Sequence, residues 1–183
     1  MKISETSIAG VWAVESVVRQ DSRGSFSRLF CADEQSSLLS GRSVVQINHS
    51  LTRSIGAIRG FHFQYQPHAE MKIVRCLRGR VFDVAVDLRR TSPTFLKWTA
   101  IELAPTNHLA FVIPEGCAHG FQVLEEDSEL LYLHTALYSS AAEGAVRFDD
   151  PKIGVQWPLP PTDISARDLG HPYLDAGFEG ITV

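Results

Sequence analysis

The chain has 183 residues, a length that usually forms one domain. Its 44% hydrophobic and 21% charged residues are typical of a globular protein, and its formal net charge of −4 argues against nucleic acid as the main partner. No apolar run reaches the ~18 residues of a membrane helix, the start MKISETSIAG has no hydrophobic signal core, and three widely spaced cysteines indicate reduced thiols. We therefore expect a cytoplasmic protein that does not bind a membrane.

Short strands dominate the prediction. Before them, CADEQSSLLSG (31–41) predicts a short helix closed by Gly41. The segments rich in Val, Ile, Leu, Phe and Tyr that follow are separated by Gly, Pro, Asn, Asp or Ser, which indicates strands with turns between them. These segments are 43–51, 56–65, 71–79, 80–89, 96–104, 108–116, 119–127 and 128–138. Such regular spacing favours an all-β sandwich or barrel.

Two further segments, a glycine turn and the C-terminal tail, also allow structural predictions. CLRGRVFDV resembles a hairpin with Gly79 at its turn. The Pro-rich tail after Trp157 indicates an irregular surface arm, in which DISARDL (163–169) predicts one helical turn capped by Asp163 or Ser165. We expect one domain over 1–183, with an N-terminal segment at about 1–45, a barrel at about 45–150 and a C-terminal arm at 151–183.

Alternation along the strands places ionisable side chains on shared faces. His62 shares a face with Gln64, whereas Phe61 and Phe63 point the other way. Asp83 and Asp87 also share one face of their strand.

In ELLYLHTALY, Tyr132, His134 and Tyr138 lie opposite an apolar face that includes Leu133 and Leu137. Strands with one apolar and one ionisable face suit a barrel that encloses a ligand cavity.

The residues alone leave several interpretations open. A single strand histidine is more often a structural residue than a catalyst, and Lys72 and Arg59 would suit a solvated surface. A metal site is the main chemical alternative, because the ligands of many cupin barrels begin with His-x-His. Gln64 replaces the second histidine of that pair here, although His62, His68, Glu70 and His119 could still supply ligands.

Ordered motifs along nearly the whole chain resemble the dTDP-4-dehydrorhamnose 3,5-epimerases, which are cupin-fold enzymes of sugar-nucleotide metabolism. The motifs are DSRGSF (21–26), VQINHS (45–50), IRGFHFQ (58–64), KIVRCLRGRVFDVAVDLRRTSPTF (72–95), IPEGCAHGF (113–121), LYLHTALY (131–138), FDDPKIGVQWPL (148–159) and SARD (165–168). The resemblance implies a jelly-roll barrel that inverts C3, C5 or both in a nucleoside-diphosphate 4-keto-6-deoxyhexose. It implies no metal and no cofactor, and a homodimer with exchanged N-terminal strands.

The resemblance also implies roles for individual residues. His62 matches the base that removes a proton next to the ketone, and Tyr132 matches the acid that returns one. Asp168 matches the carboxylate that orients the histidine, and Lys72 matches the cation beside the enolate oxygen. Positions that contact the substrate match Arg23, Gln46, Asn48, Arg59, His119, Tyr138, Glu143 and Arg167, and Arg23 would serve the neighbouring subunit's site.

Three positions depart from the family pattern and are candidates for substrate specificity. Arg28 stands where an acidic residue is usual, Ile47 stands where aspartate is usual, and His134 lies in YLHTALY where the family tends to read YKTTDYY. Two alternatives to the epimerase remain from the sequence: a metal-dependent cupin enzyme, and a cupin that binds sugar nucleotides without catalysis.

Overall fold

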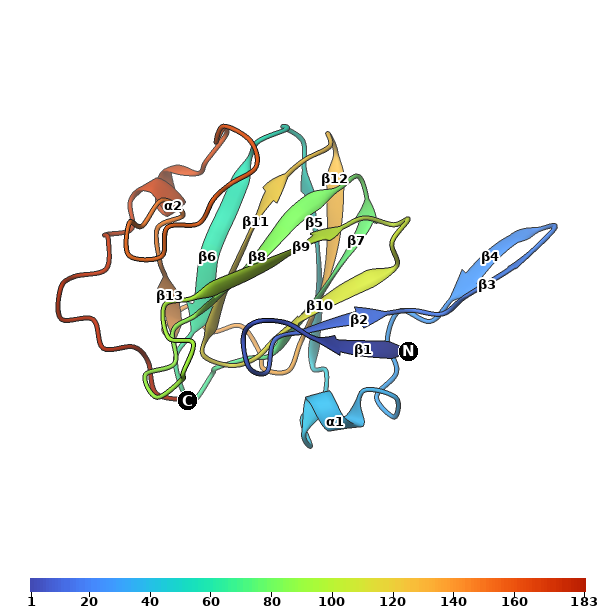
Figure 1. Ribbon diagram of the computed structural model, residues 1–183, viewed down its shortest axis with the longest axis horizontal. Coiled ribbons are helices and arrows are strands. Elements are labelled where there is room, and N and C mark those ends of the chain that lie inside the picture. The colour runs from blue at the N-terminus through green and yellow to red at the C-terminus, as the bar shows by residue number, and fades with distance from the viewer.

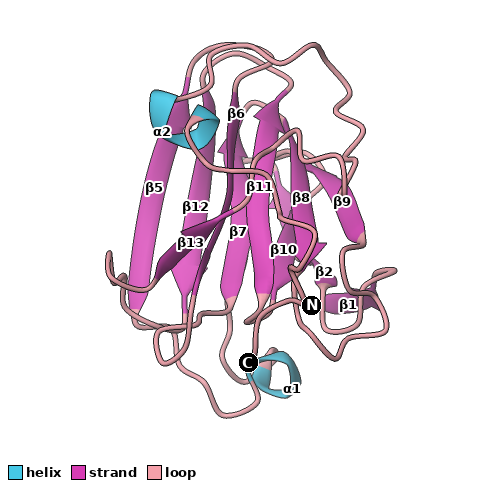
Figure 2. Ribbon diagram, turned by 90° about the vertical axis from the view of Figure 1, so that its left-hand side faces the viewer, coloured by secondary structure: helices cyan, strands magenta, loops and turns pink.

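Two antiparallel sheets face each other in a jelly-roll, as a computed structural model of all 183 residues shows (Figure 1, Figure 2). The six-stranded sheet has the order β1-β2-β10-β7-β12-β5, and the five-stranded sheet has the order β13-β6-β11-β8-β9. The strands are β1 Lys2–Glu5, β2 Trp12–Glu15, β3 Val18–Asp21, β4 Gly24–Ser27, β5 Gln46–Thr52, β6 Ile58–Gln64, β7 Lys72–Arg78, β8 Val81–Asp87, β9 Trp98–Leu103, β10 Leu109–Ile113, β11 Cys117–Val123, β12 Ser128–His134 and β13 Glu143–Ala145. The predicted all-β cupin fold is confirmed.

The main core lies between the two sheets. Val74, Phe111 and Leu130 of the six-stranded sheet pack with Val81 and Phe121 of the five-stranded sheet, and all five side chains are almost completely buried. Burial of apolar surface contributes about 25 cal/mol per Å², so this layer stabilises the barrel without disulfides. The cysteines are all free.

The C-terminal arm covers the outer face of the five-stranded sheet. Trp157 stacks on Phe61 with ring centroids 5.6 Å apart, and Ile153 and Ile181 join the same apolar cluster. Every residue of β11 is therefore buried, because this sheet has the barrel core on one face and the arm on the other. Figure 1 shows the arm, in red and orange, beside β6.

The predicted hairpin at Gly79 is wrong. Gly79 does turn the chain with a φ of 73°, but β7 pairs with β10 and β12 whereas β8 pairs with β9 and β11. The turn carries the chain from one sheet to the other. A tight glycine turn between two apolar strands has the same sequence pattern in both cases.

The predicted apolar strand face is also wrong at Leu137, which was expected to pack like Leu133. β12 ends at His134, so the alternation stops there and Leu137 is exposed, whereas Leu133 within the strand is buried. Residue patterns alone did not predict the four N-terminal strands or β13. β1 and β2 extend the six-stranded sheet, and β3 and β4 form a separate hairpin that projects from the barrel (Figure 1).

Both predicted helices are present, each as a single turn. α1 spans Ser36–Leu39 and is followed by Ser40 in a left-handed conformation and by Gly41 with a φ of 83°. α2 spans Ala166–Leu169, and Ser165 caps it by accepting a hydrogen bond from the Asp168 amide at 3.0 Å. Neither helix has the length for a membrane span.

Candidate active site

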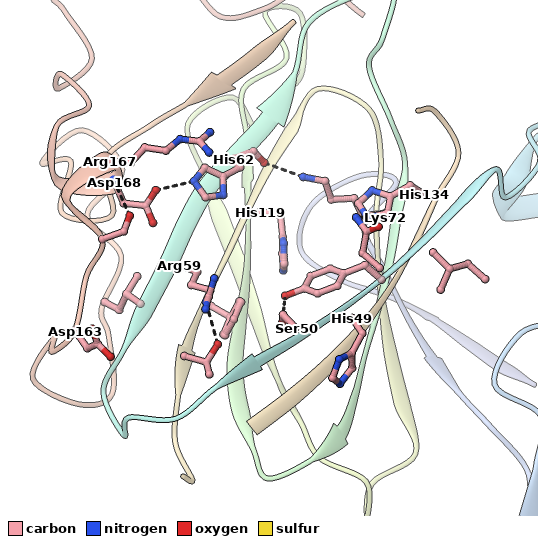
Figure 3. Close-up of a pocket in the computed structure, with 17 residues that line it drawn as sticks. His49, Ser50, Arg59, His62, Lys72, His119, His134, Asp163, Arg167 and Asp168 are labelled. Carbon is pink, nitrogen blue, oxygen red and sulfur yellow. Dashed lines mark hydrogen bonds and ion pairs between the residues drawn. The ribbon is translucent and has the colours of Figure 1, made fainter. Parts of the chain in front are cut away.

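A cavity of about 910 Å³ opens between the sheets, and the predicted catalytic residues line it (Figure 3). Its walls come from β5, β7 and β12 of one sheet, from β6 and β11 of the other, and from the segment that contains α2. Of the four residues assigned to catalysis, His62, Lys72, Tyr132 and Asp168 all line this one cavity.

His62 is held by Asp168. Its Nε2 lies 2.8 Å from Asp168 Oδ1, and Asp168 Oδ2 accepts a long hydrogen bond from the Gly60 amide at 3.4 Å. Burial would raise the pKa of Asp168, but the hydrogen bond and the charge of His62 outweigh it and hold that pKa below its usual value. Asp168 is therefore an ionised partner that fixes the imidazole, whose side chain remains 31% exposed.

Close packing of β6 on β11 fixes the backbone beside His62. Gly60 has a φ of 116°, and a Cβ at this position would lie 2.6 Å from both the Gly120 Cα and the His119 carbonyl oxygen. Only glycine fits such an approach. The motif RGFHF therefore places His62 on the cavity side while Phe61 and Phe63 pack under the arm, as strand alternation predicts.

Tyr132 lies on β12, in the opposite sheet from His62. Its hydroxyl is 3.0 Å from Ser50 Oγ, and its ring packs edge-on against His119 with centroids 6.0 Å apart. Burial raises the pKa of Tyr132 well above its usual value. The phenol therefore stays protonated at neutral pH, which is the form that can donate a proton.

Lys72 is buried in the cavity wall and is not a solvated surface charge. Its Nζ donates to the His62 carbonyl oxygen at 3.1 Å and lies 3.2 Å from Glu70 Oε1. The first contact directs the ammonium across the cavity wall toward the strand of His62 (Figure 3). His119 is likewise held by a carboxylate, since its Nε2 contacts the fully buried Asp83.

Seven of the eight residues assigned to substrate binding fall into two groups. Asn48, Arg59, His119 and Arg167 line the cavity. Gln46, Tyr138 and Glu143 lie beside it and are linked to one another and to Arg167. The Tyr138 amide donates to Gln46 Oε1 at 3.0 Å, the Tyr138 hydroxyl donates to Glu143 at 3.0 Å, and Arg167 pairs with Glu143.

The three candidate specificity residues, and Arg23 from the substrate-binding set, also lie in different places. Ile47 and His134 line the cavity. Arg23 and Arg28 do not lie in the cavity of their own chain: Arg23 pairs with Asp21 in the projecting β3–β4 hairpin, and Arg28 pairs with Glu34. A role for either arginine at an active site therefore requires a second subunit.

The metal-ligand set considered from the sequence is not brought together. Glu70 contacts Lys72 and His134, His119 contacts Asp83, and His68 is exposed. The one group with metal-ligand spacing is His62, Asp168 and His171, whose ligand atoms lie within 4.8 Å of one another. No sequence motif pointed to His171 as a residue of the site.

Several other lining residues were also missed, and strand alternation held the signal for some of them. Ser50 and Thr52 follow the predicted Asn48 at two-residue spacing on β5, and all three line the cavity. Asp163 comes from the arm, and no local pattern predicts that it reaches the cavity.

The site sets an imidazole held by a carboxylate against a buried phenol across a cavity in a jelly-roll barrel, with an ammonium beside them. Together the fold and site define a cupin-fold protein equipped for acid–base isomerisation. The family model described as dTDP-4-dehydrorhamnose 3,5-epimerase matches residues 5–176, and the chain belongs to this family of deoxysugar biosynthesis.

Individual relatives agree with this assignment along the whole chain. A dTDP-4-dehydrorhamnose 3,5-epimerase of Salmonella typhimurium is 42% identical over 96% of this chain and 96% of its own. The crystal structure of the enzyme from Elizabethkingia anophelis is 36% identical, with a TM-score of 0.91 over 97% of this chain and 98% of its own. The Legionella pneumophila epimerase, solved in complex with dTDP-4-keto-L-rhamnose, is 34% identical, with a TM-score of 0.91 over 100% of this chain and 98% of its own. The resemblance and the enzyme class inferred from the sequence are confirmed.

Proposed function

We propose that this chain inverts C3, C5 or both in a dTDP-linked 4-keto-6-deoxyhexose, with His62 as base and Tyr132 as acid. The observation that carries this proposal is their placement on opposite sheets of one cavity, each with the partner that its role requires. Inversion of a carbon needs a base on one face of the sugar and an acid on the other.

The contact between His62 and Asp168 supports one tautomer of the imidazole. Because Nε2 bonds to the ionised Asp168, it carries the hydrogen, and Nδ1 is left as the free base. The ketone at C4 acidifies the hydrogens on C3 and C5. Nδ1 accepts one of these hydrogens as a proton, the electron pair of the broken C–H bond forms the enolate, and Asp168 stabilises the resulting imidazolium.

Lys72 and Tyr132 complete the reaction. The Lys72 ammonium stabilises negative charge on the enolate oxygen. The Tyr132 hydroxyl then protonates the same carbon from the opposite face, and the electron pair of the enolate forms the new C–H bond. Solvent returns a proton to Tyr132 and removes the one on His62, so that no cofactor is consumed.

The substrate's diphosphate would bind to the cationic part of the cavity. Arg59 and Arg167 are its guanidinium groups, and a guanidinium can contact phosphate oxygens in pairs. We also propose a homodimer in which Arg23 of the projecting hairpin reaches the neighbour's cavity, since Arg23 is exposed and distant from its own. The free cysteines support a cytoplasmic location.

A panel of dTDP-, UDP-, GDP- and CDP-linked 4-keto-6-deoxyglucose in deuterated water tests the substrate. NMR would follow deuterium at C3 and C5 together with the stereochemistry of each carbon. We expect deuterium uptake with inversion for the dTDP sugar and slower or no reaction for the others. No uptake with any of the four would contradict the proposal, whereas a preference for another nucleotide would correct only its nucleoside.

A further inference from the structure

The buried carboxylate of Glu70 contacts two residues of the cavity wall, Lys72 and His134. It does not line the cavity but lies behind Lys72 and His134, which both do, and its side chain is only 8% exposed. Its Oε1 lies 3.2 Å from Lys72 Nζ, and its Oε2 lies 3.0 Å from His134 Nδ1. The Gln64 amide also donates to Oε2 at 3.3 Å.

The carboxylate is ionised despite its burial. Desolvation would raise the pKa of Glu70, but the hydrogen bond from His134 and the charge of Lys72 more than offset it and leave that pKa below its usual value. A negative charge therefore lies next to the ammonium that is to stabilise an enolate. At this distance, in a poorly solvated wall, it opposes the field of Lys72 at the substrate oxygen.

His134 is placed to reduce the effect of the Glu70 charge on Lys72. Its other nitrogen, Nε2, is 3.3 Å from the Asn48 side-chain nitrogen Nδ2, which can only donate, so Nε2 accepts and Nδ1 carries the hydrogen that is donated to Glu70. Stacking on Tyr132, with ring centroids 6.1 Å apart and an interplanar angle of 23°, holds the imidazole in this orientation. Figure 3 shows His134 and Lys72 side by side in the cavity wall.

We propose that His134 and Glu70 are positioning residues that set how strongly the Lys72 ammonium stabilises the enolate oxygen. The hydrogen bond from His134 draws the negative charge of Glu70 toward Oε2, away from Lys72. The Lys72 charge is then less neutralised at the enolate oxygen. This inference rests on the proposed epimerase reaction and adds to it a pair with no direct part in proton transfer. The effects of substituting the two residues should therefore depend on each other, because His134 contributes to kcat only while Glu70 is charged.

A double-mutant cycle tests the interdependence. His134→Thr, which keeps a strand-forming residue, should lower kcat roughly tenfold with little change in KM, because the full Glu70 charge then faces Lys72. Glu70→Gln should change kcat less than about threefold, and the Glu70→Gln/His134→Thr double variant should return to within about threefold of the wild-type kcat. Thermal melting of each variant establishes that it is folded.

His134→Asn separates this role from a direct contact with the substrate. The Asn amide can replace Nδ1 as donor to Glu70 but cannot replace Nε2, so we expect its kcat to stay within about threefold of wild type. The proposal is overturned if His134→Asn is as impaired as His134→Thr, if His134→Thr is fully active, or if the double variant is no better than His134→Thr. A wild-type chain without turnover would instead overturn the proposed reaction, and this inference with it.

Discussion

At the scale of the residue, the most informative feature is that each central side chain has a defined partner. Asp168 holds His62, Ser50 contacts Tyr132, Asp83 contacts His119 and Glu70 contacts Lys72. These partners fix ring orientation and protonation state before a substrate arrives, which is what acid–base catalysis requires.

Asp168 should make the stability of the protein depend on pH. Its pKa in the folded chain lies below the ordinary 3.8, so the unfolded chain binds the proton more readily. The stabilisation is therefore complete above about pH 4 and is lost as the pH falls through the folded pKa. We expect Asp168→Asn to lower the free energy of unfolding by about 1–3 kcal/mol at neutral pH, with a smaller difference at about pH 3.

Urea denaturation between about pH 3 and pH 7 measures this difference. Asp33→Asn is the matched control, because Asp33 is exposed and its side chain makes no hydrogen bond or ion pair. A difference for Asp168→Asn that did not shrink on acidification would contradict the assignment of Asp168 as an ionised partner.

At the scale of the element, the short helix α2 matters because it carries Asp168 to His62. The helix is one turn long, and the Ser165 hydroxyl satisfies the Asp168 amide at 3.0 Å. A helix this short is marginal without its cap and its packing. The Ser165 cap therefore also helps to hold Asp168 against His62.

Ser165→Ala should therefore weaken catalysis more than it weakens the fold. Loss of the cap costs about 1 kcal/mol locally, and we expect kcat to fall several-fold while global unfolding changes little. Ser165→Asp, which restores a cap acceptor, should recover most of the activity. Steady-state kinetics and hydrogen exchange at the amides of α2 would measure the two effects, and an Ala variant with unchanged kcat would rule out this role of the cap.

Individual elements also show what the sequence could predict. Alternation correctly placed His62, Tyr132 and His134 toward the cavity, because it depends only on strand geometry. Alternation failed at Leu137 because the end of β12 is set by tertiary pairing. The hairpin predicted from the glycine turn at Gly79 was wrong because local sequence does not say which sheet the next strand joins. Contacts between distant segments, such as Glu70 with His134, have no local pattern at all.

At the scale of the whole molecule, the β3–β4 hairpin has no partner within its own chain. It projects from the barrel (Figure 1), and Phe26 at 72% and Val17 at 67% are among the most exposed large apolar side chains. Exposed apolar side chains on a projecting hairpin suit an interface. The proposed homodimer would cover them and would bring Arg23 to a cavity.

Subunit mixing tests this arrangement. His62→Ala and Arg23→Ala should each lower activity alone, whereas a mixture refolded together should regain part of it, because one site of each mixed dimer then has both residues intact. Sedimentation should give a dimer for both variants and a monomer for Phe26→Asp. A mixture no more active than its components would show that Arg23 does not serve the neighbouring subunit.

The central claim is that His62 removes the proton and Tyr132 returns it on the other face. The most direct measurement is NMR of dTDP-4-keto-6-deoxyglucose in deuterated water with wild type, His62→Ala and Tyr132→Phe. We expect His62→Ala to lower deuterium uptake at C3 and C5 by about 10²–10⁴-fold, and Tyr132→Phe to allow some uptake while impairing inversion. Full uptake with inversion in His62→Ala would contradict the account.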